Sequence, residues 1–272
     1  MIQFPSGSAH TGPDRFHIAV IVAAGKGLRF LSSAPQTAAR HLLYKKQFAQ
    51  LSGEAVLDKT LRAFIESGCF HEIILVLSRE DFDLGESVIR RIAEETKTDI
   101  AIQIVAGGDT RFESVYNGLS YIADELIPDR PSDFCVAVHD GVRPLVTKDL
   151  IEKGLEVAAR NKSALPVVAL KETVKRIDDN GRIVETIPRD RLVRSQTPQT
   201  FQFAPLWQAF QKAVADPARP HESLTDEAKV FELYAREYGP VQTYPGDEEN
   251  IKITTYDDLS LASAIFLRRQ NL

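Results

Sequence analysis

The sequence predicts an α/β protein in which a mostly parallel, twisted sheet is flanked by helices. Short apolar runs, typical of strands buried on both faces, alternate with longer segments whose apolar residues recur at helical spacing. Parallel strands need crossover connections, usually helices, so this alternation predicts right-handed β-α-β units. One pair of β-rich segments, joined by Asn180 and Gly181, breaks the alternation and predicts a protruding β-hairpin arm.

The predicted strands are short and apolar. The first begins at His17 and runs into an Ala-Ala-Gly sequence without any polar alternation. A strand of this kind must be covered on both faces, which predicts a central position in the sheet. The further predicted strands cover residues 72–77, 100–105, 134–138, 165–170 and 250–255.

Helices are predicted where apolar residues share one face of a 3.6-residue repeat. Gly68 stands where one helix should end in a C-cap, and Thr147 stands where another should begin with an N-cap. The predicted helices lie around residues 56–65, 88–93, 115–126, 150–158, 205–215, 225–238 and 257–269.

The hairpin interrupts what is otherwise one continuous α/β pattern. Its strands are predicted at residues 173–178 and 182–187, within an arm at about residues 171–190. A hairpin inserted between α/β units projects from the sheet, and we expect it to contact a partner subunit. The sequence thus predicts a single domain over residues 17–272, preceded by a flexible extension at residues 1–16.

The composition excludes several classes of protein. The 272 residues carry a formal net charge of −5, and such an acidic chain disfavours nucleic acid as a partner. The two cysteines, Cys69 and Cys135, are too few for a metal cluster and are expected to be buried free thiols. No apolar run approaches the roughly 20 residues of a membrane span, and no signal-peptide pattern opens the chain. We therefore expect a cytoplasmic protein.

A glycine-containing loop at residues 23–29 (AAGKGLR) follows the first predicted strand. Ligands of open parallel sheets bind at the carboxyl ends of strands, where glycines let backbone N–H groups approach phosphate. A dinucleotide fingerprint would need a third glycine and a later acidic residue, but Phe30 and the pair Lys45–Lys46 stand there. The loop favours a phosphate-rich nucleotide over NAD, and the alternative is a tight turn that binds nothing.

Further polar clusters follow other predicted strands. Gly107, Gly108 and Asp109 precede a helix, Asp140 stands at a strand end where a ribose hydroxyl or Mg²⁺ could bind, and a Q-T-P-Q turn occupies residues 196–199. Lys252 lies inside an apolar segment, where the alternative is an edge lysine that faces solvent. The carboxyl ends of parallel strands share one edge of a sheet, so we expect these clusters to meet.

In their order along the chain these motifs resemble those of 2-C-methyl-D-erythritol 4-phosphate cytidylyltransferases, over about residues 17–268. The resemblance rests on AAGxGxR at 23–29, KQ at 46–47, GGDxR at 107–111, HDxxRP at 139–144, TVK at 173–175, QTPQ at 196–199, TDE at 225–227 and NIKIT at 250–254.

The resemblance implies a nucleotidyltransferase-type, Rossmann-like α/β domain that dimerises through its β-arm. It implies a Mg²⁺-dependent transfer of CMP from CTP to 2-C-methyl-D-erythritol 4-phosphate, a step of the non-mevalonate isoprenoid pathway. The implied nucleotide-binding residues are Ala23, Ala24, Gly25, Gly27, Gly108, Asp109, Ser114 and Asp140, of which Asp140 would also contact the metal. The implied catalytic cations are Arg29, Lys46, Arg189 and Lys252, with Arg189 reaching the partner subunit's site. The implied acceptor-binding residues are Arg143, Thr173, Lys175 and Thr197.

This chemistry suits the residue types. The acceptor's phosphate monoester attacks the α-phosphorus of CTP and is already an anion, so the reaction needs no general base. The barrier is the approach of two polyanions, which Lys, Arg and Mg²⁺ lower by supplying positive charge and alignment.

The sequence departs from the family pattern at several positions. Lys45 replaces a proline, the loop at residues 30–44 is long, Gly141 and Val142 replace two alanines, and Pro188 replaces an aspartate before Arg189. The last change lies on the acceptor side and leaves another polyol phosphate, such as ribitol 5-phosphate, as an alternative acceptor. The long loop is the one feature that favours a non-catalytic nucleotide-binding module.

Three other features have simpler interpretations. His139 precedes Asp140 on a strand, so their side chains point to opposite faces and His139 is expected to be structural. Trp207 and Phe210 are expected to pack a helix, and Lys45 is expected to be a solvated charge.

Overall fold

The computed structural model describes residues 16–35, 45–126 and 134–271. The predicted N-terminal extension therefore lies outside the described residues except for Phe16, as does most of the long loop before Lys45. No helix in the described part of the chain combines the length and the apolar character of a membrane span.

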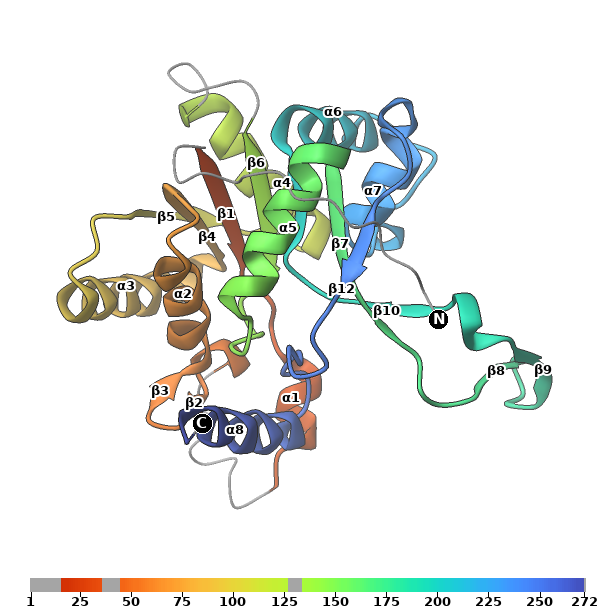
Figure 1. The fold of residues 1–272 in the computed structure, drawn as a ribbon, viewed down its shortest axis with the longest axis horizontal. Coiled ribbons are helices and arrows are strands. Elements are labelled where there is room, and N and C mark those ends of the chain that lie inside the picture. The colour runs from red at the N-terminus through yellow and green to blue at the C-terminus, as the bar shows by residue number, and fades with distance from the viewer. Residues whose placement is uncertain (1–15, 36–44, 127–133, 272) are drawn as a thin grey trace.

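The centre of the molecule is an eight-stranded sheet with the order β10-β7-β11-β6-β1-β4-β5, in which β12 also pairs with β7 (Figure 1). Strand β1 runs parallel to β4 and β6, β4 runs parallel to β5, and β10 and β11 run antiparallel to their neighbours. The predicted class, a mostly parallel sheet flanked by helices, is confirmed. The strands are β1 (His17–Val22), β4 (Glu72–Leu77), β5 (Ala101–Ala106), β6 (Cys135–Asp140), β7 (Ser163–Ala169), β10 (Val193–Ser195), β11 (Gln199–Gln202) and β12 (Thr243–Pro245).

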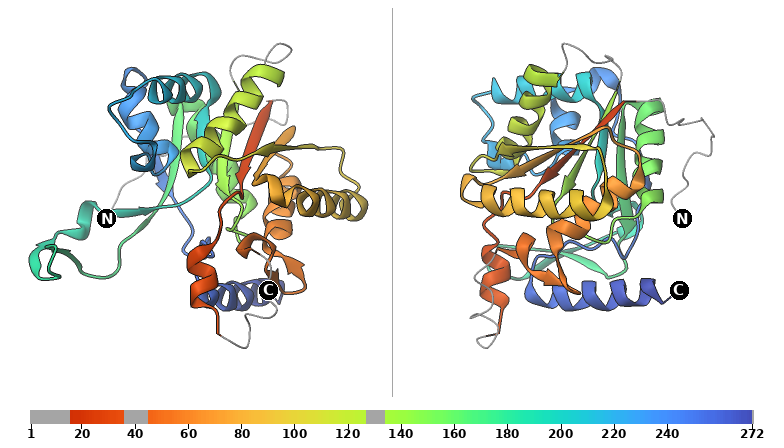
Figure 2. Two further views of the ribbon diagram at one scale, coloured as in Figure 1. Left: turned by 180° about the vertical axis from the view of Figure 1, so that it is seen from behind. Right: turned by 90° about the vertical axis from the view of Figure 1, so that its left-hand side faces the viewer.

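Alternate residues of the central strands supply two separate apolar cores. Ala19 and Ile21 of β1 pack with α2, α3 and α5 on one face, whereas Ile18 and Val20 pack with α4, α6 and α7 on the other. Helix α5 lies in front of the sheet in Figure 1, and the view from behind in Figure 2 shows α4 on the opposite face. These helices are α2 (Val56–Ser67), α3 (Phe82–Thr96), α4 (Arg111–Tyr121), α5 (Lys148–Asn161), α6 (Phe203–Val214) and α7 (Glu227–Tyr234).

A third, smaller core lies beyond the carboxyl ends of the strands. It joins α1 (Leu28–Ser33) to α8 (Tyr256–Gln270), which lie side by side below the sheet in Figure 1. Phe30, Ile253 and Ala262 are completely buried in it. Ala49, which follows the turn η1 (Lys46–Phe48), Leu51 of the short strand β2 (Gln50–Leu51) and Val56, which follows β3 (Glu54–Ala55), also belong to it.

Local signals of the sequence explain the ends of two helices. Gly68 ends α2 in the left-handed region at φ 68°, as predicted, and the Thr147 side chain accepts a hydrogen bond from the Leu150 amide at the start of α5. The predicted strand at residues 250–255 is wrong. Although its side chains alternate, this segment joins no sheet, and Ile253 N–H donates to the Val142 carbonyl at 2.9 Å.

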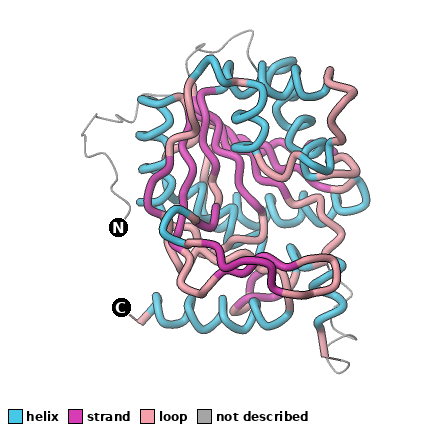
Figure 3. Tube along the Cα trace, turned by 90° about the vertical axis from the view of Figure 1, so that its right-hand side faces the viewer, coloured by secondary structure: helices cyan, strands magenta, loops and turns pink. Residues whose placement is uncertain are grey.

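The predicted hairpin is confirmed as β8 (Val174–Ile177) paired with β9 (Ile183–Ile187). The Asp178 carboxylate closes the turn by accepting hydrogen bonds from the amides of Asn180 and Arg182. The hairpin extends away from the sheet in Figure 1 and crosses in front of the body when viewed from its own side in Figure 3.

Candidate active site

A cleft of about 1200 Å³ opens at the carboxyl ends of β1, β4, β5 and β6. This is where an open parallel sheet normally binds its ligand. The clusters at residues 23–29 and 107–109, Asp140 and Lys252 meet there in one cavity as expected, whereas the Q-T-P-Q turn at residues 196–199 does not line it. The sequence-predicted residues that line it are Ala23, Ala24, Gly25, Gly27, Arg29, Lys46, Gly108, Asp109, Ser114, Asp140 and Lys252.

The glycine loop forms one wall of the cleft. Gly27 adopts φ 67°, a left-handed conformation that favours glycine, and the chain turns there into α1. Gln47, buried beside the loop, donates from Nε2 to the carbonyl oxygens of Ala23 at 2.8 Å and Gly25 at 3.4 Å. Gln47 was part of a sequence motif but had no predicted role, and the structure makes it the side chain that holds the loop.

The second wall is the turn between β5 and α4. A Cβ on Gly107 would come within 2.5 Å of Ala24 Cβ, so glycine is what lets this turn approach the first loop so closely. The Ser114 hydroxyl donates to the Thr110 carbonyl at 2.9 Å and accepts from the Gly108 amide at 3.2 Å. The backbone of Gly108 and Asp109 is thereby held at the rim of the cleft.

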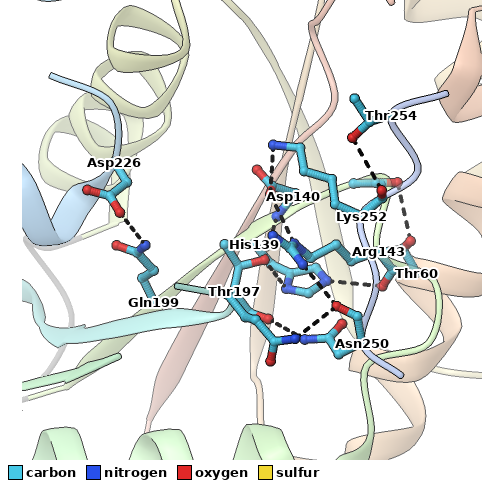
Figure 4. Close-up of polar contacts among 12 residues, drawn as sticks. Thr60, His139, Asp140, Arg143, Thr197, Gln199, Asp226, Asn250, Lys252 and Thr254 are labelled. Atoms are coloured by element: carbon cyan, nitrogen blue, oxygen red, sulfur yellow. Dashed lines mark hydrogen bonds and ion pairs between the residues drawn. The ribbon is translucent and has the colours of Figure 1, made fainter. Parts of the chain in front are cut away.

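Asp140, at the end of β6, is surrounded by three cations (Figure 4 shows two of them). Its Oδ1 accepts from Arg111 Nε at 3.3 Å, and its Oδ2 lies 3.1 Å from Arg143 Nε and 3.0 Å from Lys252 Nζ. Burial disfavours the charged carboxylate, but the charges of Arg111, Lys252 and Arg143 outweigh burial and hold the pKa of Asp140 well below its usual range. Asp140 is therefore ionised at any physiological pH.

Three cations that line the cleft come from different segments: Arg29 from α1, Lys46 from η1 and Lys252 from the segment before α8. Burial, together with the nearby charges of Lys252 and Arg29, lowers the pKa of Lys46 to about 8. Positive charge is thus concentrated in this cleft although the whole chain is acidic, which suits a small polyanion.

His139 is structural, as predicted. It is fully buried, its Nδ1 is hydrogen-bonded to Thr197 Oγ1 at 2.9 Å, and its Nε2 lies 3.2 Å from the Arg143 carbonyl oxygen. Burial lowers the pKa of His139 to about 3, so the ring is neutral. Figure 4 shows this ring beneath Asp140, and His139 is not among the residues that line the cleft.

Two of the predicted acceptor-binding residues lie beneath the cleft. Thr197 is buried, and its hydroxyl accepts from the Asp140 amide at 3.2 Å. Arg143 is held between Asp140 and the Asn250 carbonyl, to which its Nη1 donates at 2.9 Å. Asn250 in turn donates from Nδ2 to the Thr197 carbonyl at 2.8 Å.

The other predicted acceptor residues lie on the arm, away from the cleft of their own chain. Thr173, Lys175 and Arg189 are exposed, Lys175 Nζ donates to Thr186 Oγ1 at 2.6 Å, and Arg189 donates to the Lys171 carbonyl. A single chain therefore does not bring them together with the residues of the cleft.

Lys45 was expected to be a solvated charge, and this expectation is wrong. Its ammonium group is ion-paired with Glu80 and with Asp81, 2.7 Å away, and donates to Ser78 Oγ at 2.7 Å. These partners directly follow β4, so Lys45 attaches the turn that carries Lys46 to the carboxyl end of that strand.

Sequence reasoning missed two charged residues beside the site. Arg111 lines the cleft, and Glu227, a buried residue at the start of α7, binds its guanidinium in a bidentate pair. Arg111 is the last residue of the GGDxR motif and Glu227 the last residue of the TDE motif, so the motifs could have indicated both residues.

Trp207 and Phe210 pack α6, as expected. The Trp207 ring stacks on Tyr116 with centroids 5.4 Å apart, and Phe210 stacks on Phe112 at 4.9 Å. Neither cysteine forms a disulfide; Cys135 is buried as predicted and Cys69 is partly buried.

Comparison with known proteins identifies the family. The family model for 2-C-methyl-D-erythritol 4-phosphate cytidylyltransferase matches residues 17–268. The enzyme of that name from Bacteroides thetaiotaomicron is 37% identical over 90% of this chain and 97% of its own length, and the one from Clostridium botulinum is 34% identical over 92% and 99%. The crystal structure of 4-diphosphocytidyl-2C-methyl-D-erythritol synthase from Anaerococcus prevotii is similar with a TM-score of 0.73 and 32% identity, covering 93% of this chain and 96% of that one. This chain therefore belongs to the 2-C-methyl-D-erythritol 4-phosphate cytidylyltransferase family.

Proposed function

We propose that this protein transfers CMP from CTP to 2-C-methyl-D-erythritol 4-phosphate and releases pyrophosphate, a step of isoprenoid precursor synthesis. The observation that carries the proposal is the convergence of Arg29, Lys46 and Lys252 on one cleft at the carboxyl edge of the sheet. The same cleft contains the glycine loop, and the family match covers both.

The reaction joins two polyanions. An oxygen of the acceptor's phosphate monoester forms a bond to the α-phosphorus of CTP, and the bond between that phosphorus and the bridging oxygen of pyrophosphate breaks. The nucleophile is already ionised, which agrees with a neutral, buried His139. The protein's contribution is charge stabilisation and in-line alignment, because little proton transfer is required.

We propose for these residues the roles that the family resemblance implies. Ala23, Ala24, Gly25 and Gly27 surround the triphosphate, and Gly108, Asp109 and Ser114 contact the base. Arg29, Lys46 and Lys252 are the catalytic cations, with Lys252 placed to contact the phosphates of both substrates. Arg is suited to bidentate phosphate contact, whereas Lys acts as a movable point charge.

The cleft fits a divalent cation that arrives with the nucleotide. The described residues hold no group of three or more His, Cys, Asp or Glu side chains that could form a metal cage. Mg²⁺ is usually held by one or two carboxylates together with substrate phosphates, and Asp140 supplies one such carboxylate. We propose Mg²⁺ as the cation, held by Asp140 and the phosphates, where it would neutralise charge on the triphosphate.

We further propose that two chains pair through the arm. Ile177, Ile183 and Val184 are 60%, 66% and 62% exposed, which leaves an apolar surface on the hairpin for a partner. In such a dimer Thr173, Lys175 and Arg189 would bind the acceptor in the partner subunit's cleft. Arg143 and Thr197 lie beneath the cleft of their own chain and would hold Asp140 in place through their hydrogen bonds to it. Each chain would then be a single domain over residues 17–272 with its arm, and the dimer would be the catalytic unit.

The test is a coupled assay of pyrophosphate release with CTP, Mg²⁺ and two acceptors. We expect turnover with 2-C-methyl-D-erythritol 4-phosphate and much less with ribitol 5-phosphate. Preference for ribitol 5-phosphate would change the acceptor but keep the reaction. CTP binding without pyrophosphate release for either acceptor would overturn the proposal in favour of a nucleotide-binding module.

A further inference from the structure

Glu227 is a buried carboxylate that lies outside the lining of the cleft. It is 1% exposed and begins α7. Its Oε1 accepts from Arg111 Nη1 at 2.6 Å and its Oε2 accepts from Arg111 Nη2 at 3.1 Å. Both oxygens of Glu227 are therefore engaged by one guanidinium, in the bidentate geometry that fixes orientation as well as distance.

The same guanidinium reaches the reaction site with its remaining nitrogen. Arg111 Nε donates to Asp140 Oδ1 at 3.3 Å, so Arg111 bridges two buried carboxylates. The other oxygen of Asp140 lies near Arg143 and Lys252. Each oxygen of Asp140 thus has its own cationic partners, and the oxygen that does not contact Lys252 is held by Arg111.

The position of Glu227 is itself fixed by a side chain of the sheet. Gln199 on β11 accepts from the Ala228 amide at 2.8 Å and donates to Asp226 Oδ2 at 2.9 Å. Asp226 Oδ1 accepts from the Lys229 amide at 3.0 Å and caps α7. Figure 4 shows the contact between Gln199 and Asp226 on the far side of the site from Lys252. The first turn of α7 is thereby attached to the strand next to β6.

We propose that Glu227 is a positioning residue for cytidylyl transfer, which acts through Arg111 on Asp140 and thereby on Lys252. This inference rests on the function proposed for the cleft. Without the charge of Glu227, Arg111 is free to form a bidentate pair with Asp140. That pair would draw the carboxylate away from Lys252 and change where the lysine holds its ammonium group.

The test compares Glu227→Gln with Glu232→Gln. The second variant makes the same change on the same helix at a carboxylate that is 53% exposed. The measurements are kcat and KM for both substrates, expressed per folded enzyme from circular dichroism, and the dissociation constant of CTP with Mg²⁺ from calorimetry. We expect Glu227→Gln to lower kcat by about tenfold or more, because small displacements of catalytic groups cost this much. Glu232→Gln should stay within about twofold of the wild type.

A double-mutant cycle with Asp140→Asn separates positioning from a purely structural role. If Glu227 acts through Asp140, adding Glu227→Gln to Asp140→Asn should change kcat and CTP affinity by less than about twofold. The inference would be overturned if the two substitutions lowered kcat and CTP affinity additively. It would also be overturned if Glu227→Gln had the kcat and CTP affinity of the wild type. If Glu227→Gln does not fold, Glu227→Asp, which keeps the charge but is shorter by one methylene, enters the same cycle. If the wild type releases no pyrophosphate, the proposed function fails, and the cycle on CTP affinity alone decides the role of Glu227.

Discussion

Lys252 Nζ lies 3.0 Å from Asp140 Oδ2, so the lysine assigned to the phosphates is held by the carboxylate assigned to the metal. The two groups come from distant parts of the chain, Asp140 from the end of β6 and Lys252 from just before α8. Each therefore depends on the other for its position in the cleft.

Lys252→Ala should abolish most of the turnover and leave the fold intact. The lysine side chain is 34% exposed, so its loss leaves no large cavity. Loss of one charge that opposes the transition state costs roughly 10²–10³-fold in kcat, by analogy with an oxyanion-hole donor. The control is Lys148→Ala, a lysine that is 57% exposed on α5. Near-normal pyrophosphate release by Lys252→Ala, with an unchanged melting temperature, would remove this lysine from the mechanism.

CTP affinity should fall as pH rises above about 8, the pKa to which burial and neighbouring cations lower Lys46. Below this pKa the ammonium form is present before CTP binds. Above it the amine is neutral, and CTP must drive the uptake of a proton, because a bound triphosphate favours the charged lysine. Calorimetry at pH 8.5 in buffers of different ionisation enthalpy measures this uptake.

Lys46→Arg provides the control for that titration, because arginine stays protonated over the whole range. The variant should lose the proton uptake that the wild type shows. An equal uptake in both proteins would assign it to a different group.

Gln47→Leu should raise KM for CTP by loosening the glycine loop. The substitution preserves approximate size but removes the donor to the carbonyls of Ala23 and Gly25, and a buried unpaired polar group costs about 1–3 kcal/mol. Steady-state kinetics with varied CTP measure the effect, and Gln50→Leu, at an exposed position of β2, is the matched control. A Gln47→Leu enzyme with unchanged KM would show that the loop keeps its shape without this side chain.

Mixing inactive Arg189→Ala and Lys252→Ala subunits should restore activity if Arg189 acts across a dimer. Random exchange makes half of the dimers mixed, and each mixed dimer contains one intact site of two, so about a quarter of the wild-type activity is expected. Pyrophosphate release after subunit exchange measures it. Activity that stays at the level of the separate variants would confine the site to one chain.

Features that depend on a local pattern of residues, such as the buried strands, could be predicted from the sequence. The strand at Glu72–Leu77 was predicted with its observed bounds because it is buried on both faces and is continuously apolar after Glu72. The segment at residues 250–255 was wrongly predicted to be a strand because apolar and polar residues alternate at Ile251, Lys252 and Ile253. This alternation has a cause other than strand pairing. Ile253 fills the third core and Lys252 enters the cleft, without any neighbouring strand.

Contacts between distant segments could not be predicted from local patterns. Lys45 pairs with Asp81, 36 residues away, and Arg111 pairs with Glu227, 116 residues away, and nothing in either neighbourhood specifies its partner. The cations proposed to be catalytic were expected from the family resemblance, whereas the side chains that hold them in place were visible only in three dimensions.

The third core connects the C-terminal helix to all three segments that carry the proposed catalytic cations of the cleft. Arg29 is followed by Phe30, Lys252 is followed by Ile253, and Lys46 lies three residues before Ala49, and all three apolar side chains are buried in this core with Ala262 of α8. A change in the packing of α8 would therefore affect the segments that carry all three cations at the same time. Substitutions on the inner face of α8 offer a way to tune the whole positive site against the nucleotide, whereas substitutions in the cleft alter one charge at a time.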